Sequence, residues 1–103
     1  MSSVLKATIH APRFVAGARD AARDVVVVWH KHLPLGHGVT SEYPGYTVEV
    51  REEGIEHAEV LDRANHAAPA LRCATREAIK LWDEADDACQ AWAKQLRATK
   101  GGA

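Results

Sequence analysis

This sequence has almost no net charge and no long run of apolar residues. Its 13 lysines and arginines face 14 aspartates and glutamates, for a net charge of −1 and a pI near 6.6. The chain therefore has no general positive field that would attract nucleic acid or anionic lipid. It has no stretch of 18 apolar residues, and residues 1–6 lack the pattern of a secretory signal. We expect a soluble, cytoplasmic protein that binds neither nucleic acid nor membrane directly.

Large apolar side chains are also few. Aromatic residues make up 6% of the chain, and alanine accounts for 19 of its apolar residues. A chain of 103 residues is long enough for one modest core and too short for two. We therefore expect a single protein-binding domain over residues 1–103, with a disordered tail at 99–103 and a core thin enough to favour a homodimer.

The two cysteines cannot bridge each other if they share a helix. Cys73 and Cys89 are sixteen residues apart, which is about 24 Å along a helix, whereas a disulfide requires Cα atoms within about 7 Å. We expect them to be small buried hydrophobic residues in a reducing cytosol. An intermolecular disulfide or a reactive thiol remains the alternative.

The N-terminal third predicts a strand and then a helix. Apolar residues alternate over 4–10, which is typical of a strand with one covered face. From Phe14 to Trp29 they recur at three- and four-residue spacing, so we expect a helix over 12–32. The four valines at 25–28 are β-branched and favour a strand instead, so a strand is the open alternative there.

The middle of the chain predicts a loop, a strand and a second helix. Glycines and prolines concentrate in 33–45, which indicates a connecting loop. Alternation over 46–51 predicts a strand. After a possible turn at Glu53 and Gly54, we favour a helix over 57–67, with a third strand as the competing interpretation.

The strongest pattern lies at the C-terminal end, where apolar residues alternate at four- and three-residue spacing. This row consists of Leu71, Thr75, Ala78, Trp82, Ala85, Cys89, Trp92 and Leu96. Such spacing is typical of a bundle or coiled-coil seam, so we expect a long helix over 70–98 whose row packs in the core or against a second copy. The resulting fold class is α+β, with a two- or three-stranded antiparallel sheet packed by helices.

The residue types needed for catalysis do not occur in useful patterns. His30, His32 and His37 have no cysteine or carboxylate beside them, and no histidine pair has the spacing of a helical zinc site. Gly36-His37-Gly38 is an isolated Gly-x-Gly, and no Gly-x-Ser-x-Gly element occurs. We expect no metal, no cofactor and no enzyme activity, with a zinc-dependent hydrolase as a distant alternative.

Binding to another protein is therefore the expected role. The first strand lies next to the terminus, so it should form a sheet edge with free backbone groups. Phenylalanine and arginine near its end are suited to the centre of an interface. The predicted contact residues are Leu5, Ile9, His10, Arg13 and Phe14.

Three stretches resemble the QslA-type quorum-sensing antiactivators of pseudomonads. They are residues 9–14 (IHAPRF), residues 25–32 (VVVVWHKH) and the helix from Trp82 to Trp92. The resemblance implies a homodimeric α+β protein that binds the ligand-binding domain of the activator LasR. Binding would block LasR dimerisation and hence its attachment to two operator half-sites. A phage-encoded inhibitor of the anti-CRISPR kind, an immunity protein or an antitoxin would fit the same sequence features.

Overall fold

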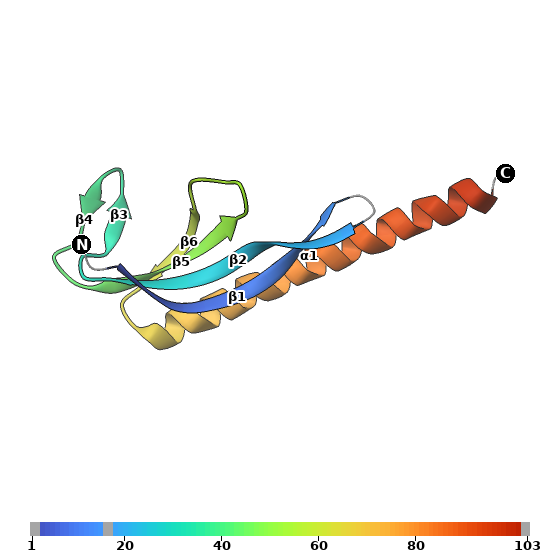
Figure 1. Ribbon diagram of the computed structural model, residues 1–103. Coiled ribbons are helices and arrows are strands. Elements are labelled where there is room, and N and C mark those ends of the chain that lie inside the picture. Colours follow the sequence, from blue (N-terminus) through green and yellow to red (C-terminus); the bar gives the residue numbers. More distant parts are fainter. Residues whose placement is uncertain (1–2, 16–17, 102–103) are drawn as a thin grey trace.

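Four long strands and one helix form the body of the protein (Figure 1). The computed structural model describes the backbone of residues 3–15 and 18–101, and the side chains of residues 3–13 and 23–99. The elements are β1 (Ser3–Val15), β2 (Ala18–His30), β3 (Pro34–Gly36), β4 (Val39–Thr40), β5 (Gly45–Glu52), β6 (Glu59–Ala64) and α1 (Ala67–Gly101).

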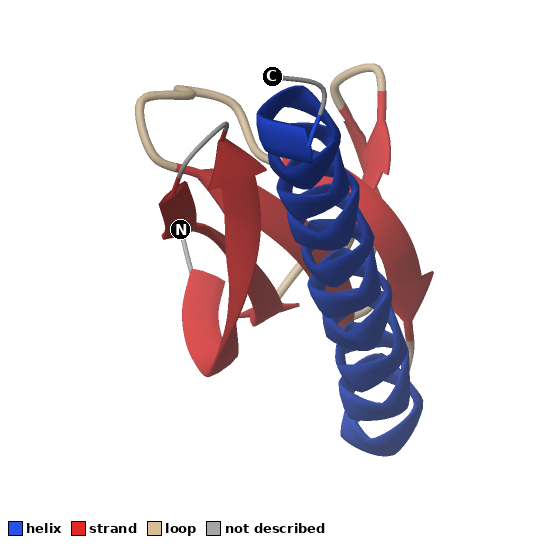
Figure 2. Cartoon of the chain, turned by 90° about the vertical axis from the view of Figure 1, so that its right-hand side faces the viewer, coloured by secondary structure: helices blue, strands red, loops and turns tan. Residues whose placement is uncertain are grey.

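The main sheet is antiparallel, with strand order β1-β2-β5-β6, and α1 lies across one of its faces (Figure 2). The predicted α+β class and the long C-terminal helix are confirmed. The sheet has four strands where two or three were expected, and a single helix covers it. This helix runs through Gly101, so Thr99 and Lys100 are helical where a disordered tail was expected.

The helix expected over 12–32 is wrong. Residues 18–30 form β2, which pairs with β1 on one side and β5 on the other. Val25 and Val27 pack with α1 on one face of the strand, Val26 and Val28 lie on the other face, and all four are buried. A strand buried on both faces is a continuous apolar run, which imitates the all-round apolar surface of a buried helix. The alternative interpretation, a strand at 25–28, is the correct one.

The helix expected over 57–67 is also wrong. The chain reverses at Glu53 and Gly54, where Gly54 has φ +80°, and residues 59–64 return along β5 as β6. The helical interpretation depended on apolar residues at three- and four-residue spacing from Ile55 to Ala68, but Ile55 is 57% exposed. As a strand, this segment satisfies its backbone hydrogen bonds by pairing with β5, whereas a helix there would bury little apolar surface.

The segment 33–45 contains a small hairpin of β3 and β4. Gly36, His37 and Gly38 all have positive φ (97°, 54° and 78°), a sequence of conformations that two glycines make accessible. Leu33 anchors its base, because it is buried and its backbone exchanges hydrogen bonds with Tyr43 and Ser41. The Gly-x-Gly therefore forms a hairpin turn.

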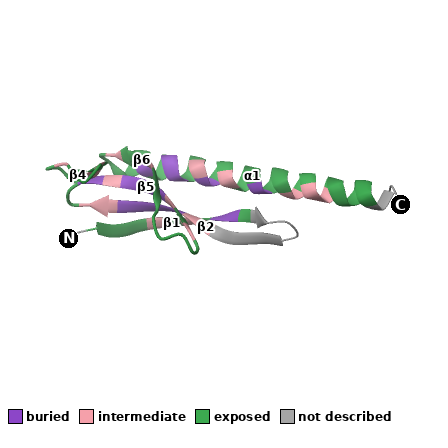
Figure 3. Ribbon diagram, turned by 90° about the horizontal axis from the view of Figure 1, so that it is seen from above, coloured by how far each residue is buried: buried purple, intermediate pink, exposed green. Residues whose placement is uncertain are grey.

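Small helix residues let α1 lie close to the sheet. Ala70, Cys73, Ala74 and Ala78 pack against the valines of the central strands, and the buried residues of α1 face the strands (Figure 3). The predicted heptad row is divided by this packing. Ala78 and Ala85 are buried, Cys89 and Trp92 are half-buried, and Leu71, Trp82 and Leu96 are exposed.

Candidate functional site

The outer edge of β1 is free of strand partners in the described sheet, as the sequence predicts. Val4 and Leu5 are exposed there, Leu5 at 52%. Trp82 of α1 reaches the same strand further along, where its Nε1 donates a hydrogen bond to the carbonyl of His10 over 3.2 Å. The open part of the edge is therefore residues 3–8.

The predicted contact residues do not share one surface. A β-bulge between Leu5 and Ala7 places Leu5 opposite Val28, on the face away from α1. Ile9 lies opposite Val25, and it packs against the core on the helix side. Of these two aliphatic residues, only Leu5 is exposed.

The other three predicted residues have different roles. His10 is exposed, and its Nδ1 lies 2.6 Å from Oδ1 of Asp24. Arg13 Nη1 lies 3.4 Å from Oε2 of Glu52. The backbone of Phe14 belongs to β1, but its side chain lies outside the described residues.

Arg13 also lines a cavity of about 170 Å³ together with Arg23, Glu84, Ala85 and Ala88. Arg23 Nη2 donates to the carbonyl of Pro12 over 3.0 Å, and its Nη1 lies 3.8 Å from Glu84. The Nε of Arg23 is buried without a hydrogen-bond partner in the described part of the chain. The carboxylate of Glu52 lies near the guanidinium group of Arg13, and that of Glu84 lies near Arg23. The cavity is therefore close to neutral and has no surplus positive charge for an anion.

A chain of polar side chains crosses the face of the sheet away from α1. Ser3 Oγ lies 3.0 Å from His30 Nδ1, and His30 Nε2 lies 2.8 Å from Thr47 Oγ1. The Thr47 hydroxyl donates in turn to Glu49, whose other oxygen lies 3.4 Å from Arg51. With the Thr47 proton directed at Glu49, His30 donates from Nε2 and accepts the Ser3 proton at Nδ1.

Sequence reasoning missed this polar chain. The available signal was the alternation of Thr47, Glu49 and Arg51 on one face of a strand. The arrangement differs from a catalytic triad, because Thr47 stands between the imidazole and the carboxylate, which are 3.9 Å apart. It satisfies the buried groups of Thr47 and Glu49 and ties β1, β2 and β5 together.

The described residues contain no group of three metal-ligating side chains close enough to hold an ion. His30 is engaged as above, and His32 Nδ1 lies 3.2 Å from the carbonyl of Ser41. Within the same described ranges, no helix combines the length and the apolar character needed to cross a bilayer.

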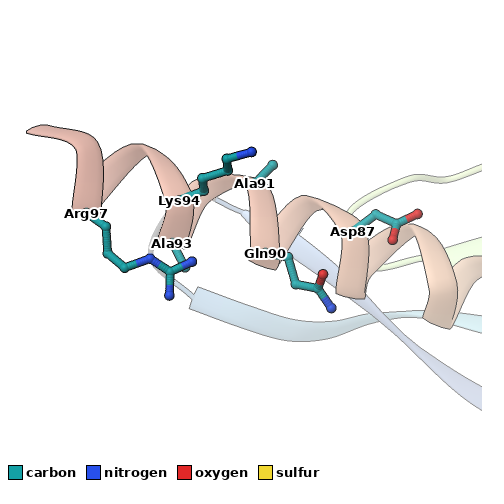
Figure 4. A pocket seen from close by; sticks show the side chains of 6 residues that line it. All are labelled: Asp87, Gln90, Ala91, Ala93, Lys94 and Arg97. Atoms are coloured by element: carbon teal, nitrogen blue, oxygen red, sulfur yellow. The ribbon is translucent and has the colours of Figure 1, made fainter.

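A larger hollow of about 520 Å³ lies near the end of α1 and carries no converging groups. Its lining residues are Asp87, Gln90, Ala91, Ala93, Lys94 and Arg97. All six come from one helix, and Figure 4 shows their side chains spreading to different sides of it. Ligand sites need polar groups aimed at a common point, so this surface is not a small-molecule pocket.

The two thiols should differ in reactivity. Burial raises the pKa of the Cys73 thiol, a hydrogen bond from Arg76 lowers it in part, and the Asp62 carboxylate raises it further. Cys89 is half-buried. In a timed reaction with a disulfide reagent at neutral pH, we expect fast labelling at Cys89, and labelling at Cys73 only when the protein unfolds. Cys89→Ser should abolish the fast phase; a fast phase that persists would contradict this assignment.

The chain was compared with protein-family models, curated proteins and solved structures, and none of the three comparisons found a match.

Proposed function

We propose that this protein is a non-catalytic regulator that acts by binding another protein through the open edge of β1. The observation that carries the proposal is the exposed aliphatic pair Val4 and Leu5 on an unpaired edge strand. Such an edge offers backbone hydrogen-bonding groups and apolar side chains to an incoming strand or loop.

The shape of the molecule supports a binding role. Its accessible surface is 7209 Å² and its radius of gyration is 17.5 Å, whereas compact domains of about 100 residues have a radius near 13 Å. The surface is about a quarter larger than that of a compact monomer of 11.2 kDa. Much of this excess is available for a standard interface, which covers about 800 Å² on each partner.

The proposed partner is the ligand-binding domain of a LuxR-type quorum-sensing activator, LasR. This choice rests on the resemblance of residues 9–14, 25–32 and 82–92 to the QslA-type antiactivators. In this proposal the protein acts in the cytoplasm as a homodimer. It covers the surface through which the activator dimerises, so the activator can no longer occupy two operator half-sites.

The test compares matched substitutions on the two edges of the sheet. Leu5→Lys places a charge on the open edge of β1, and Val60→Lys places one on β6, the opposite edge, where Val60 is 40% exposed. We expect Leu5→Lys to abolish complex formation with the purified LasR ligand-binding domain, because an edge lysine opposes strand addition. Val60→Lys should bind like the wild type. The measurement is analytical size exclusion with light scattering.

Each outcome is informative, because both positions are exposed and both variants should fold. Loss of binding in Leu5→Lys alone supports the edge of β1. If Leu5→Lys binds like the wild type, the interface does not include the open edge of β1. No binding by the wild type excludes LasR as the partner, and activity of the activator's target promoter in cells provides an independent check.

A further inference from the structure

The face of α1 turned away from the sheet carries an ordered row of opposite charges. Arg72 and Arg76 are followed by Ile79, and then by Asp83 and Asp87. The spacing of four, three, four and four residues keeps all five on one side of a helix. All five side chains are exposed, Ile79 at 55%. At 3.6 residues per turn they lie on the side of the helix opposite the buried Ala74, Ala78 and Ala85.

These charges are not used within the described part of the chain. No ion pair there engages Arg72, Arg76, Asp83 or Asp87, although Arg76 does bond the Cys73 thiol. By contrast, the neighbouring Lys80 is paired with Glu77 over 3.2 Å. The two arginines also border a shallow depression of about 430 Å³ that includes Leu71, Thr75 and Ile79. The row is therefore a free surface with an apolar centre, one basic end and one acidic end.

We infer that this row binds the same row of a second copy, with the two helices antiparallel. In that arrangement Arg72 of one copy faces Asp87 of the other, and Arg76 faces Asp83. Both pairings share one centre, between residues 79 and 80, so a single register satisfies them together. Twofold symmetry repeats each pair, which gives four ion pairs around two adjacent Ile79 side chains.

A second copy fits this row because, when the helix is turned end to end, each arginine of one copy meets an aspartate of the other. Residues 72 to 87 span about 22 Å of helix, a length over which two helices at a small crossing angle stay in contact. Single exposed ion pairs contribute little, but four pairs around an apolar centre fix one register and exclude others. An unrelated partner would need the same charge order by coincidence.

The predicted heptad row is a poorer dimer surface than this outer row. Two of its residues, Ala78 and Ala85, are already buried against the sheet. Trp82 is bonded to the carbonyl of His10 on β1. A second helix docked along the heptad row would have to displace these contacts, whereas the outer row is open.

This inference rests on the homodimer of the proposed function and identifies its interface. Because α1 covers one face of the sheet, pairing through its outer side leaves both copies of the β1 edge uncovered. Loss of the dimer and loss of partner binding can therefore be measured separately, in the same variants.

The experiment is a charge exchange followed by sedimentation equilibrium of the full chain. Arg76→Glu and Asp83→Arg each put like charges opposite each other twice in the dimer. We expect each to raise the dimer dissociation constant by about tenfold or more at low salt. The double variant R76E/D83R restores opposite charges and should recover most of the wild-type affinity. Arg97→Glu lies on the same side of the helix beyond the contact and is the matched control.

Two results would overturn the inference. A monomeric wild type, or a double variant that stays as weak as the singles, excludes the antiparallel register. If the reversals leave the dimer intact while Leu71→Asp and Leu96→Asp dissociate it, the heptad row is the interface. If a monomeric Arg76→Glu variant still binds LasR, the dimer is not needed for LasR binding, and failure of one proposal does not imply failure of the other.

Discussion

Replacing Ala74 by leucine should destabilise the protein by about 1–3 kcal/mol. Ala74 is fully buried in the cluster where α1 meets Val25, Val27 and Val48. A leucine there has no room unless the helix moves away from the sheet. For a small domain, each kcal/mol lost corresponds to a decrease of about 4–8 °C in Tm. Thermal unfolding followed by circular dichroism measures the change.

The matched control is Ala91→Leu, on the same helix. Ala91 is exposed, and leucine is a good helix former, so we expect a change within about 0.5 kcal/mol. Equal stability of Ala74→Leu and Ala91→Leu would mean that the helix does not pack on the sheet through its alanine face.

Replacing Thr47 by valine should cost about 1–3 kcal/mol, because it leaves two polar groups without their shared partner. The Thr47 hydroxyl accepts from His30 Nε2 and donates to Glu49, and the side chain is fully buried. Valine has nearly the same shape, so the packing is retained while both hydrogen bonds are lost. Urea unfolding should show a lower midpoint with an unchanged slope.

Thr40→Val serves as the control, because Thr40 lies exposed in β4 and should tolerate the change. If Thr47→Val is as stable as the wild type, the Thr47 hydroxyl is not needed. His30 and Glu49 would then have to shift closer than the present 3.9 Å to bond each other directly.

The sequence predicts elements best where one side is buried and the other exposed. The alternation over 46–51 and the long periodic segment after Pro69 both identify the correct element. The pattern fails at 25–28, because a strand buried on both faces has no polar side to mark its period. It also fails at 59–64, an edge strand exposed over most of its length, where burial leaves little trace in the sequence.

The proposed binding surface was only partly predictable, for a similar reason. Position in the chain identified β1 as an edge strand, but the bulge that separates Leu5 from Ile9 has no marker in the sequence. The polar chain from Ser3 to Arg51 joins residues almost fifty positions apart. Such contacts depend on strand register, which a single sequence does not specify.

The order of elements along the chain has a consequence for synthesis on the ribosome. In the main sheet β2 pairs with β1, β5 with β2, and β6 with β5. The sheet can therefore grow by one strand at a time as the chain emerges. The helix that covers Val25, Val27 and Val48 is made only after the whole of this sheet. Until about residue 85 has emerged, the nascent protein exposes a valine-rich sheet with two open edges, and this is the interval in which it is most prone to aggregate.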